Sequence, residues 1–146
     1  MRRALIVLLV LLGCGSKREP SSSGPPRIVS LTPSATEVVA ALGATAELVG
    51  VDQYSDYPEE VTKLPKVGSF LVPNIEAIVA LKPTLVILDD IHGQVGGALR
   101  DQGLETIECD MHGLPDVKTA LRTIGQRLGR TREADAAIAE IDRALD

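Results

Sequence analysis

The sequence predicts an α/β fold, in which a Rossmann-like parallel sheet is flanked by helices. Short apolar runs typical of buried strands alternate with segments whose apolar residues recur at helical spacing. The links between these segments are short, as right-handed strand–helix–strand crossovers allow. With 146 residues, of which 45% are hydrophobic and 24% charged, the chain is sized for one packed domain.

The N-terminal residues are predicted to form a leader and a tether. A basic start precedes an unbroken apolar run over residues 4–12, which is too short to span a bilayer but has the form of a secretory signal. The sequence LLGC, which ends at Cys14, resembles the bacterial lipoprotein box, in which the cysteine is acylated. We therefore expect a signal peptide over 1–13 and a lipid-anchored linker over 14–26, unless Cys14 is incidental to an ordinary signal.

Ordered structure is expected to begin with a strand, a helix and a second strand. The apolar run over residues 28–31 predicts the first strand. Ser34, followed three residues later by Glu37, fits a capping box that opens a helix, and Gly43 is suited to end it. Residues 48–51 predict the second strand.

The pattern then repeats. Asn74 is a suitable N-cap for a helix that Pro83 cannot continue. Residues 84–88 are apolar without alternation, which predicts a central parallel strand buried on both faces. A glycine-rich loop should lead to a helix that ends near Gly103, and residues 104–108 predict the last strand.

Two further helices are predicted at the end of the sequence. Apolar residues from Val117 to Leu128 recur at helical spacing, and Gly129 marks a stop. The last helix begins near Thr131 and is still running at Asp146, without a cap. We therefore expect it to be the start of a longer helix.

Charge and cysteine content limit the function classes. The formal net charge is −5, which argues against a nucleic-acid partner because binding to phosphates needs a basic surface. Of the two cysteines, one is Cys14 and the other is Cys109. With Cys14 acylated, no disulfide can form within the chain, so the fold has to depend on its apolar core.

The aromatic residues are few and gathered in one segment. The chain has no tryptophan, two tyrosines and one phenylalanine, and all three rings lie between Tyr54 and Phe70. Rings in the loops at the strand ends of an α/β sheet can stack on a flat ligand. The alternative is that they only seal the loop onto the core.

Three motifs carry a resemblance to a known family. They are GVDQYSDYP over residues 50–58, LPKVGSF over 64–70 and NIEAIVALKPTLVI over 74–87. In combination they resemble the N-terminal lobe of vitamin B12-binding and related iron-chelate-binding proteins, the substrate-binding components of ABC importers. The resemblance implies that residues 27–130 form this lobe, that 131–146 begin the single helix joining two lobes, and that the second lobe is absent.

The resemblance also implies site residues. Tyr54 corresponds to a tyrosine that lies against the corrin ring, and Phe70 stands where B12 binders often present a tryptophan; Ser34 and Asp89 complete the expected ligand-binding set. Asp89 stands where a second tryptophan is common, so the ligand can be a corrinoid, a ferric siderophore or haem. Glu76 corresponds to the acid that docks onto an arginine pocket of the membrane permease, although the helix dipole alone also favours an acid there.

The sequence gives little support to a metal-ion site or to an enzyme. A metal-ion site could form from Cys109–His112 (CDMH) together with Asp89, Asp90 and His92, but C-x-x-H occurs once and without a partner pair, so none is expected. An enzyme is not expected either, because the glycines of residues 93–97 do not form G-x-G-x-x-G and no nucleophile or zinc-protease motif is present.

The sequence therefore predicts a lipid-anchored substrate-binding protein of the cell envelope, facing the periplasm or the cell exterior. Its expected partners are ABC permease subunits, a small-molecule ligand and the lipid bilayer. No cofactor is expected, because the ligand is cargo. The alternatives that stay open are a metal-ion or haem-binding receptor, and a truncated permease-docking module that binds no ligand.

Overall fold

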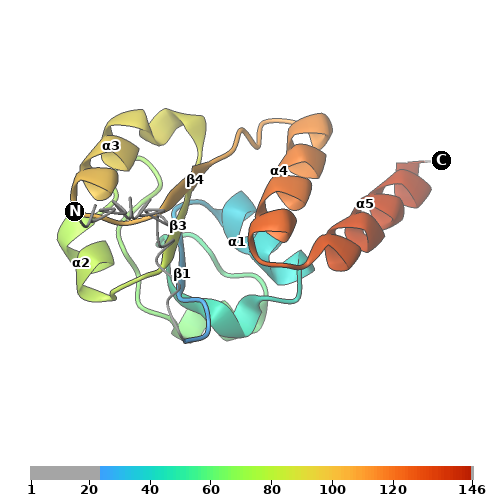
Figure 1. Cartoon of the computed structure of the whole chain (residues 1–146). Helices are drawn as coiled ribbons and strands as arrows, with labels where there is room; N and C mark the ends of the chain where they lie inside the picture. Colours follow the sequence, from blue (N-terminus) through green and yellow to red (C-terminus); the bar gives the residue numbers. More distant parts are fainter. Residues whose placement is uncertain (1–23, 146) are drawn as a thin grey trace, which may run out of the picture.

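Four parallel strands form the centre of the fold (Figure 1). The computed structural model describes residues 24–145, so the predicted leader, Cys14 and most of the predicted linker lie outside the described residues. The strands lie in the order β2-β1-β3-β4. They are β1 (Ile28–Ser30), β2 (Leu48–Val51), β3 (Leu85–Leu88) and β4 (Thr106–Glu108). The predicted α/β fold with a parallel sheet is confirmed.

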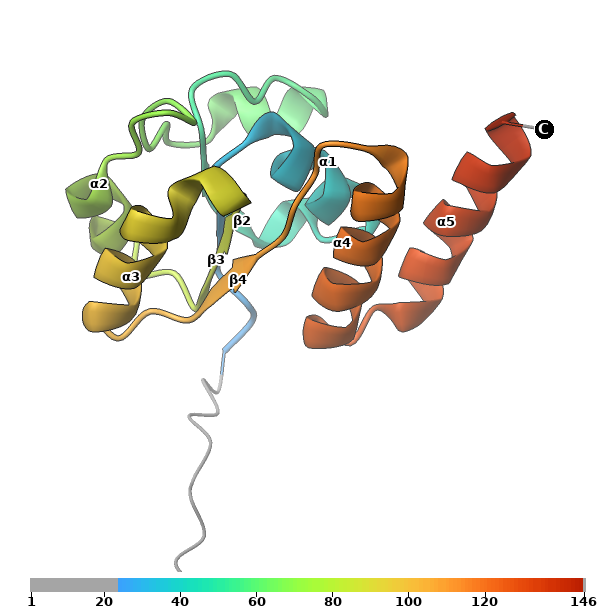
Figure 2. The same cartoon turned by 90° about the horizontal axis from the view of Figure 1, so that it is seen from above.

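Helices cover both faces of this sheet, as Figures 1 and 2 show from two directions. One layer consists of α1 (Pro33–Ala41), α4 (Leu114–Arg127) and α5 (Thr131–Leu145), and the other of α2 (Ile75–Ala80) and α3 (Gly93–Asp101). Three short 3₁₀ turns lie between these elements: η1 (Thr45–Glu47), η2 (Glu59–Lys63) and η3 (Asp90–His92). All helices predicted from the sequence are present.

Each face of the sheet has its own apolar core, because successive strand residues point to opposite sides. Ile28, Leu85 and Ile87 pack with residues of α1, α4 and α5. Val29 and Val86 belong to a second cluster, with residues of α2 and α3. All four residues of β3 are buried, which explains why this strand reads as an unbroken apolar run.

The start of α1 differs from the prediction. Its N-cap is Thr32, whose side chain accepts a hydrogen bond from the Ala35 amide at 3.1 Å. Pro33 is the first helical residue, and Ser34 is the second. The predicted capping box from Ser34 to Glu37 is therefore wrong. Proline has a backbone angle already suited to the first helical position, and this moves the helix start upstream of Ser34.

Other helix ends follow the prediction. The Asn74 side chain caps α2 by accepting a hydrogen bond from the Ala77 amide at 3.0 Å. Gly43, Gly103 and Gly129 follow α1, α3 and α4 with φ of 69°, 78° and 69°. These left-handed conformations are easy for glycine and let the chain leave the helix.

The glycine-rich segment is part of a helix rather than a loop. The 3₁₀ turn η3 leads directly into α3, which begins at Gly93, and β4 begins at Thr106 instead of Leu104. A Cβ atom at Gly96 would lie 3.1 Å from Cδ1 of Leu88. The glycine thus lets α3 approach β3 closely, and this contact, which lies between segments, could not be seen in the local pattern.

The last helix projects from the body of the fold (Figure 2). Ala134 and Ile138 are buried against the α1–α4 layer, whereas the Leu145 side chain near its end is 62% exposed. Among residues 24–145, none of the helices combines the length and the apolar character that crossing a membrane would need. The prediction that α5 starts an interlobe helix stays a prediction.

A glycine in α4 sets how closely α5 can approach. A Cβ atom at Gly125 would come within 2.8 Å of the Ala134 Cβ and 3.1 Å of the Arg130 carbonyl oxygen. We expect Gly125→Ala to lower the free energy of unfolding by about 1–2 kcal/mol, because overpacking outweighs the better helix propensity of alanine. Gly97→Ala is the matched control, since a Cβ there meets no atom within 4 Å.

The control should raise the free energy of unfolding by about 0.5–1 kcal/mol through helix propensity alone. Urea unfolding followed by circular dichroism measures both variants. A stabilising effect at both glycines would show that α4 and α5 are not held at this close distance.

Candidate functional site

The carboxyl ends of the four strands open on one edge of the sheet, where α/β proteins of this kind bind ligands. The loops at this edge also expose large apolar side chains. Tyr54 follows β2, Leu71 and Val72 lie in the loop before α2, and Ile91 follows β3. Their exposed fractions are 54%, 71%, 74% and 55%. This rim of exposed apolar groups at the strand ends is not part of the core, and exposed apolar patches of this kind often mark binding surfaces.

Tyr54 and Phe70 meet at this rim. Their ring centroids lie 5.9 Å apart at an interplanar angle of 62°, which is an edge-to-face contact. Tyr54 remains 54% exposed and Phe70 is partly buried. About half of the Tyr54 surface is thus accessible to a ligand, whereas Phe70 is more covered. Their role in ligand binding stays a prediction.

A buried chain of hydroxyl groups holds the loop that carries Tyr54. Ser30 Oγ lies 2.6 Å from Thr36 Oγ1, which lies 2.7 Å from Ser55 Oγ. The Ser55 hydroxyl donates to Asp52 Oδ1, and the other Asp52 oxygen accepts from the Tyr54 amide at 2.9 Å. The Ser55 proton goes to Asp52, whereas the single Thr36 proton faces both Ser55 Oγ at 2.7 Å and the Thr32 carbonyl at 3.2 Å. The hydroxyl groups thus link β1 to a buried carboxylate next to Tyr54.

Backbone pairing brings Phe70 beside Tyr54. The Val51 amide donates to the Pro65 carbonyl at 3.0 Å, and the Val67 amide donates back to Val51 at 2.9 Å. The Gln53 amide then donates to the Gly68 carbonyl at 2.8 Å. Gly68 has φ of 98°, and a Cβ there would lie 2.6 Å from a backbone oxygen. Only glycine fits the turn that aims the next residues at the rim.

His92 holds the Phe70 loop from the side of β3. Its Nδ1 accepts a hydrogen bond from the Asp89 amide at 3.1 Å, so its Nε2 carries the proton and donates to the Phe70 carbonyl. His92 is 3% exposed. This neutral tautomer is therefore a structural clamp, and His92 is not one of the residues brought together as candidate metal ligands.

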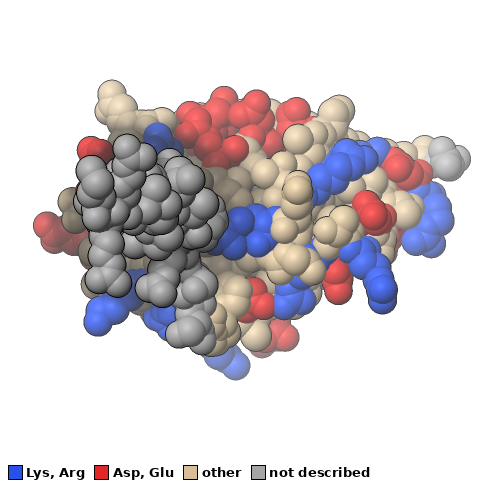
Figure 3. Space-filling view, viewed as in Figure 1, with Lys and Arg blue, Asp and Glu red and all other residues tan. Residues whose placement is uncertain are grey.

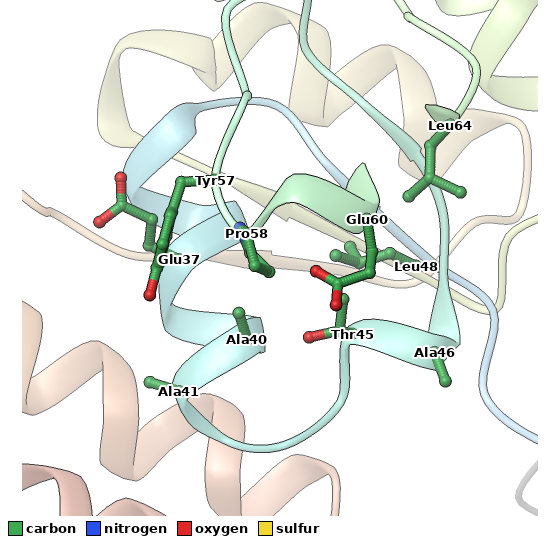
Figure 4. A pocket seen from close by; sticks show the side chains of 10 residues that line it. All are labelled: Glu37, Ala40, Ala41, Thr45, Ala46, Leu48, Tyr57, Pro58, Glu60 and Leu64. Atoms are coloured by element: carbon green, nitrogen blue, oxygen red, sulfur yellow. The ribbon is translucent and has the colours of Figure 1, made fainter. Parts of the chain in front are cut away.

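Tyr57 lies apart from the pair formed by Tyr54 and Phe70. It is 67% exposed and lines a hollow of about 780 Å³ together with Pro58 and residues of α1, η1 and η2. Figure 4 shows its ring beside Glu37, with Leu48 at the back of the hollow. Leu48 is the first residue of β2, so this hollow extends toward the amino ends of the strands. This hollow lacks the paired rings of the rim around Tyr54.

Two predicted site residues lie apart from the ring pair. Ser34 is exposed on α1 and lines a groove between α1, α4 and α5, where Val38, Leu121 and Ile141 are its neighbours. Glu76 is exposed in the first turn of α2 and borders an open hollow with the Phe70 loop. In the described residues no hydrogen bond or ring contact joins either side chain to Tyr54.

Carboxylates after β3 meet an imidazole after β4. His112 Nε2 lies 2.9 Å from Asp90 Oδ1 and 3.5 Å from Asp89 Oδ1. Burial raises the pKa of the Asp89 carboxyl, and contact with Asp90 adds to this shift. Hydrogen bonds from Asp89 and His112 hold the pKa of Asp90 below its usual range, and the Asp90 carboxylate raises the pKa of His112. Figure 3 shows acidic side chains gathered where Figure 1 places the loops after β3 and β4.

Comparison with known proteins decides the family. Residues 28–146 match the model of the periplasmic binding protein family. The chain belongs to this family. A vitamin B12-binding protein from Salmonella paratyphi A (strain ATCC 9150 / SARB42) is 35% identical over 127 residues, covering 85% of this chain and 44% of that protein. An uncharacterised ABC transporter substrate-binding lipoprotein, YvrC, from Bacillus subtilis (strain 168) is 34% identical over 119 residues, covering 78% and 38%.

A solved structure agrees with this assignment. The apo form of the periplasmic haem-binding protein RhuT from Roseiflexus sp. RS-1 superposes with a TM-score of 0.75 at 34% identity. The match covers 82% of this chain and 47% of that one. This periplasmic binding protein chain thus spans less than half the length of the relatives that it matches. The predicted family is confirmed.

The positioning residues of this family member were missed in the sequence. Asp52 and Ser55 lie within the motif over residues 50–58, where the spacing of Asp and Ser could have indicated a side-chain turn. Thr36 and His92 gave no such signal, because the partners through which they hold the ring-bearing loops, Ser55 and Phe70, are 19 and 22 residues away. Cys109 is half-buried, and burial raises the pKa of its thiol, so it is packed as a small apolar residue.

The hydroxyl chain can be tested at its central member. We expect Thr36→Val, which keeps the shape but removes the hydroxyl, to lower the free energy of unfolding by about 1–3 kcal/mol because Ser30 and Ser55 lose a buried partner. Thr123→Val on the exposed side of α4 is the matched control and should change it by less than about 0.5 kcal/mol. Equal effects in urea unfolding would contradict the role given to Thr36.

Proposed function

We propose that this chain is the cargo-binding lobe of an ABC importer, and that Tyr54 and Phe70 form its contact for a broad, flat cargo such as a corrinoid or haem. The observation that carries the proposal is the pair of contacting rings, one of them 54% exposed, at the carboxyl edge of a parallel sheet. The relatives named for vitamin B12 and haem binding support this class of cargo.

The chemistry of the rim suits such a cargo. An aromatic side chain stacked on a flat conjugated ring contributes about 0.5–1.5 kcal/mol beyond the burial of area. Leu71 and Val72 beside the rings add exposed apolar surface that a large ligand can cover. The rim is open, so this lobe alone offers one side of a clamp, and we expect it to bind cargo weakly by itself.

Glu76 is the proposed docking residue for the permease. Its carboxylate is exposed in the first turn of a helix capped by Asn74, so it is presented by a rigid element. Such an oriented carboxylate can accept paired hydrogen bonds from an arginine. Charge pairing at the rim of an interface also favours fast association.

The proposal extends to where the protein is located and what it does there. Acylation of Cys14 would place the chain on a membrane of the cell envelope, with the tether over residues 14–26 between lipid and lobe. The curated relative from Bacillus subtilis, described as a lipoprotein, supports this. The proposed activity is binding and delivery of cargo, without catalysis.

Cargo binding is tested with cyanocobalamin and haemin. We expect Tyr54→Ala and Phe70→Ala to weaken binding at least about tenfold, equivalent to 1.4 kcal/mol, because the stacking surface is lost. Tyr57→Ala is the matched control, since this exposed tyrosine lines the other hollow. Absorption changes of the ligand and the shift in melting temperature measure both. Parent-like binding by both rim variants, or an equal loss in Tyr57→Ala, would reject the assignment.

Permease docking is tested with a separate pair of variants. We expect Glu76→Ala to abolish retention by the permease in detergent while leaving cargo binding unchanged, because Glu76 does not contact the rings. Asp135→Ala on the exposed side of α5 serves as the charge-matched control. Docking without any measurable cargo binding by the parent would favour the alternative of a docking module.

A further inference from the structure

A second group of side chains at the same edge has no part in the proposed cargo contact. Asp89 and Asp90 follow β3, and His112 follows β4. Because β3 and β4 are neighbours in register from Val86 to Leu88, the loops after them meet. One nitrogen or oxygen from each of the three residues lies within 4.8 Å of the others.

One buried atom in this group lacks a hydrogen bond. Asp89 Oδ1 is buried and accepts no hydrogen bond, and the residue as a whole is 6% exposed. This oxygen lies 3.5 Å from His112 Nε2, so it is aimed into the group rather than away from it. An unsatisfied buried carboxylate oxygen is costly, and a cation among the three groups would satisfy it.

Two of the three distances within the group fit a shared ion. Two ligand atoms that each lie about 2.1 Å from one metal ion are about 3.0–3.4 Å apart for octahedral or tetrahedral geometry. The two distances from His112 Nε2 to the carboxylate oxygens are 2.9 and 3.5 Å. One imidazole nitrogen and two carboxylate oxygens are ligands that suit Zn²⁺ and Mn²⁺.

We propose that Asp89, Asp90 and His112 bind one divalent transition-metal ion such as Zn²⁺ or Mn²⁺. Asp89 is the buried anchor of the site, and His112 and Asp90 close it from the solvent side, where their side chains are 57% and 47% exposed. Three protein ligands leave coordination positions for water. Cys109 and His92 do not take part, because the first is not in the group and the second clamps Phe70.

The site is tested by calorimetric titration of the Cys14→Ser chain with ZnCl₂ and, separately, with MnCl₂, without any cargo. The Cys14→Ser substitution removes a thiol that could bind zinc outside the proposed site. We expect one ion per chain with at least one of the two metals. Asp89→Asn and His112→Ala should each weaken binding at least tenfold, because each removes a ligand. Asp110→Asn is the matched control and should bind like the parent, since Asp110 is exposed and outside the group.

If Asp89→Asn folds poorly, two other measurements still test the proposed metal site. Asp90→Asn and His112→Gln change exposed side chains and should weaken binding in the same way. Substoichiometric Mn²⁺ should broaden the imidazole resonances of His112 in the parent, and this broadening should be lost in Asp90→Asn, which removes a ligand. Absence of binding by the parent, parent-like affinity in His112→Ala, or an equal loss in Asp110→Asn would each overturn the proposal. None of these outcomes depends on whether the rings bind cargo.

Discussion

Parallel pairing of four short strands is the constraint on which the functional edge depends. All four strands run in the same direction, so their carboxyl ends open on one side. In the sheet, Ser30 stands opposite Ile87, and Leu88 stands opposite Glu108. This register places the loops after β3 and β4 next to one another, with β1 between them and the end of β2. Residues more than fifty positions apart in the chain meet there, which no local element could achieve.

Several tethers of different chemistry keep the ring-bearing loops in place. A chain of buried hydroxyl groups that ends at Asp52 fixes the Tyr54 loop. Backbone hydrogen bonds from Val51 and Gln53 fix the start of the Phe70 loop, and His92 fixes its middle. Ordering a loop before the ligand arrives reduces the entropy that binding would otherwise lose. This arrangement buries several polar groups, and each of them needs a hydrogen-bond partner.

The functional edge thus has two parts of unlike character. The rings, with Leu71 and Val72, come from the segment between β2 and α2, and the carboxylates and the imidazole come from the loops after β3 and β4. His92 joins the two parts, because its ring contacts both the Asp89 amide and the Phe70 carbonyl. The position of the Phe70 loop is thus tied to that of Asp89 by one side chain. Neither part includes Ser34, which faces a groove between helices instead.

The sequence by itself determined the α/β class, the order of strands and helices, and the glycine stops after α1, α3 and α4, because these depend on local periodicity and backbone freedom. It also placed Tyr54 and Phe70 in loops at the strand ends. The tertiary structure alone decided that these two rings touch while Tyr57 turns away, and that Asp89 is buried beside His112. It also decided that Gly96 belongs in a helix. Those outcomes depend on contacts between distant segments, and local pattern carries no information about which side chains such contacts bring together.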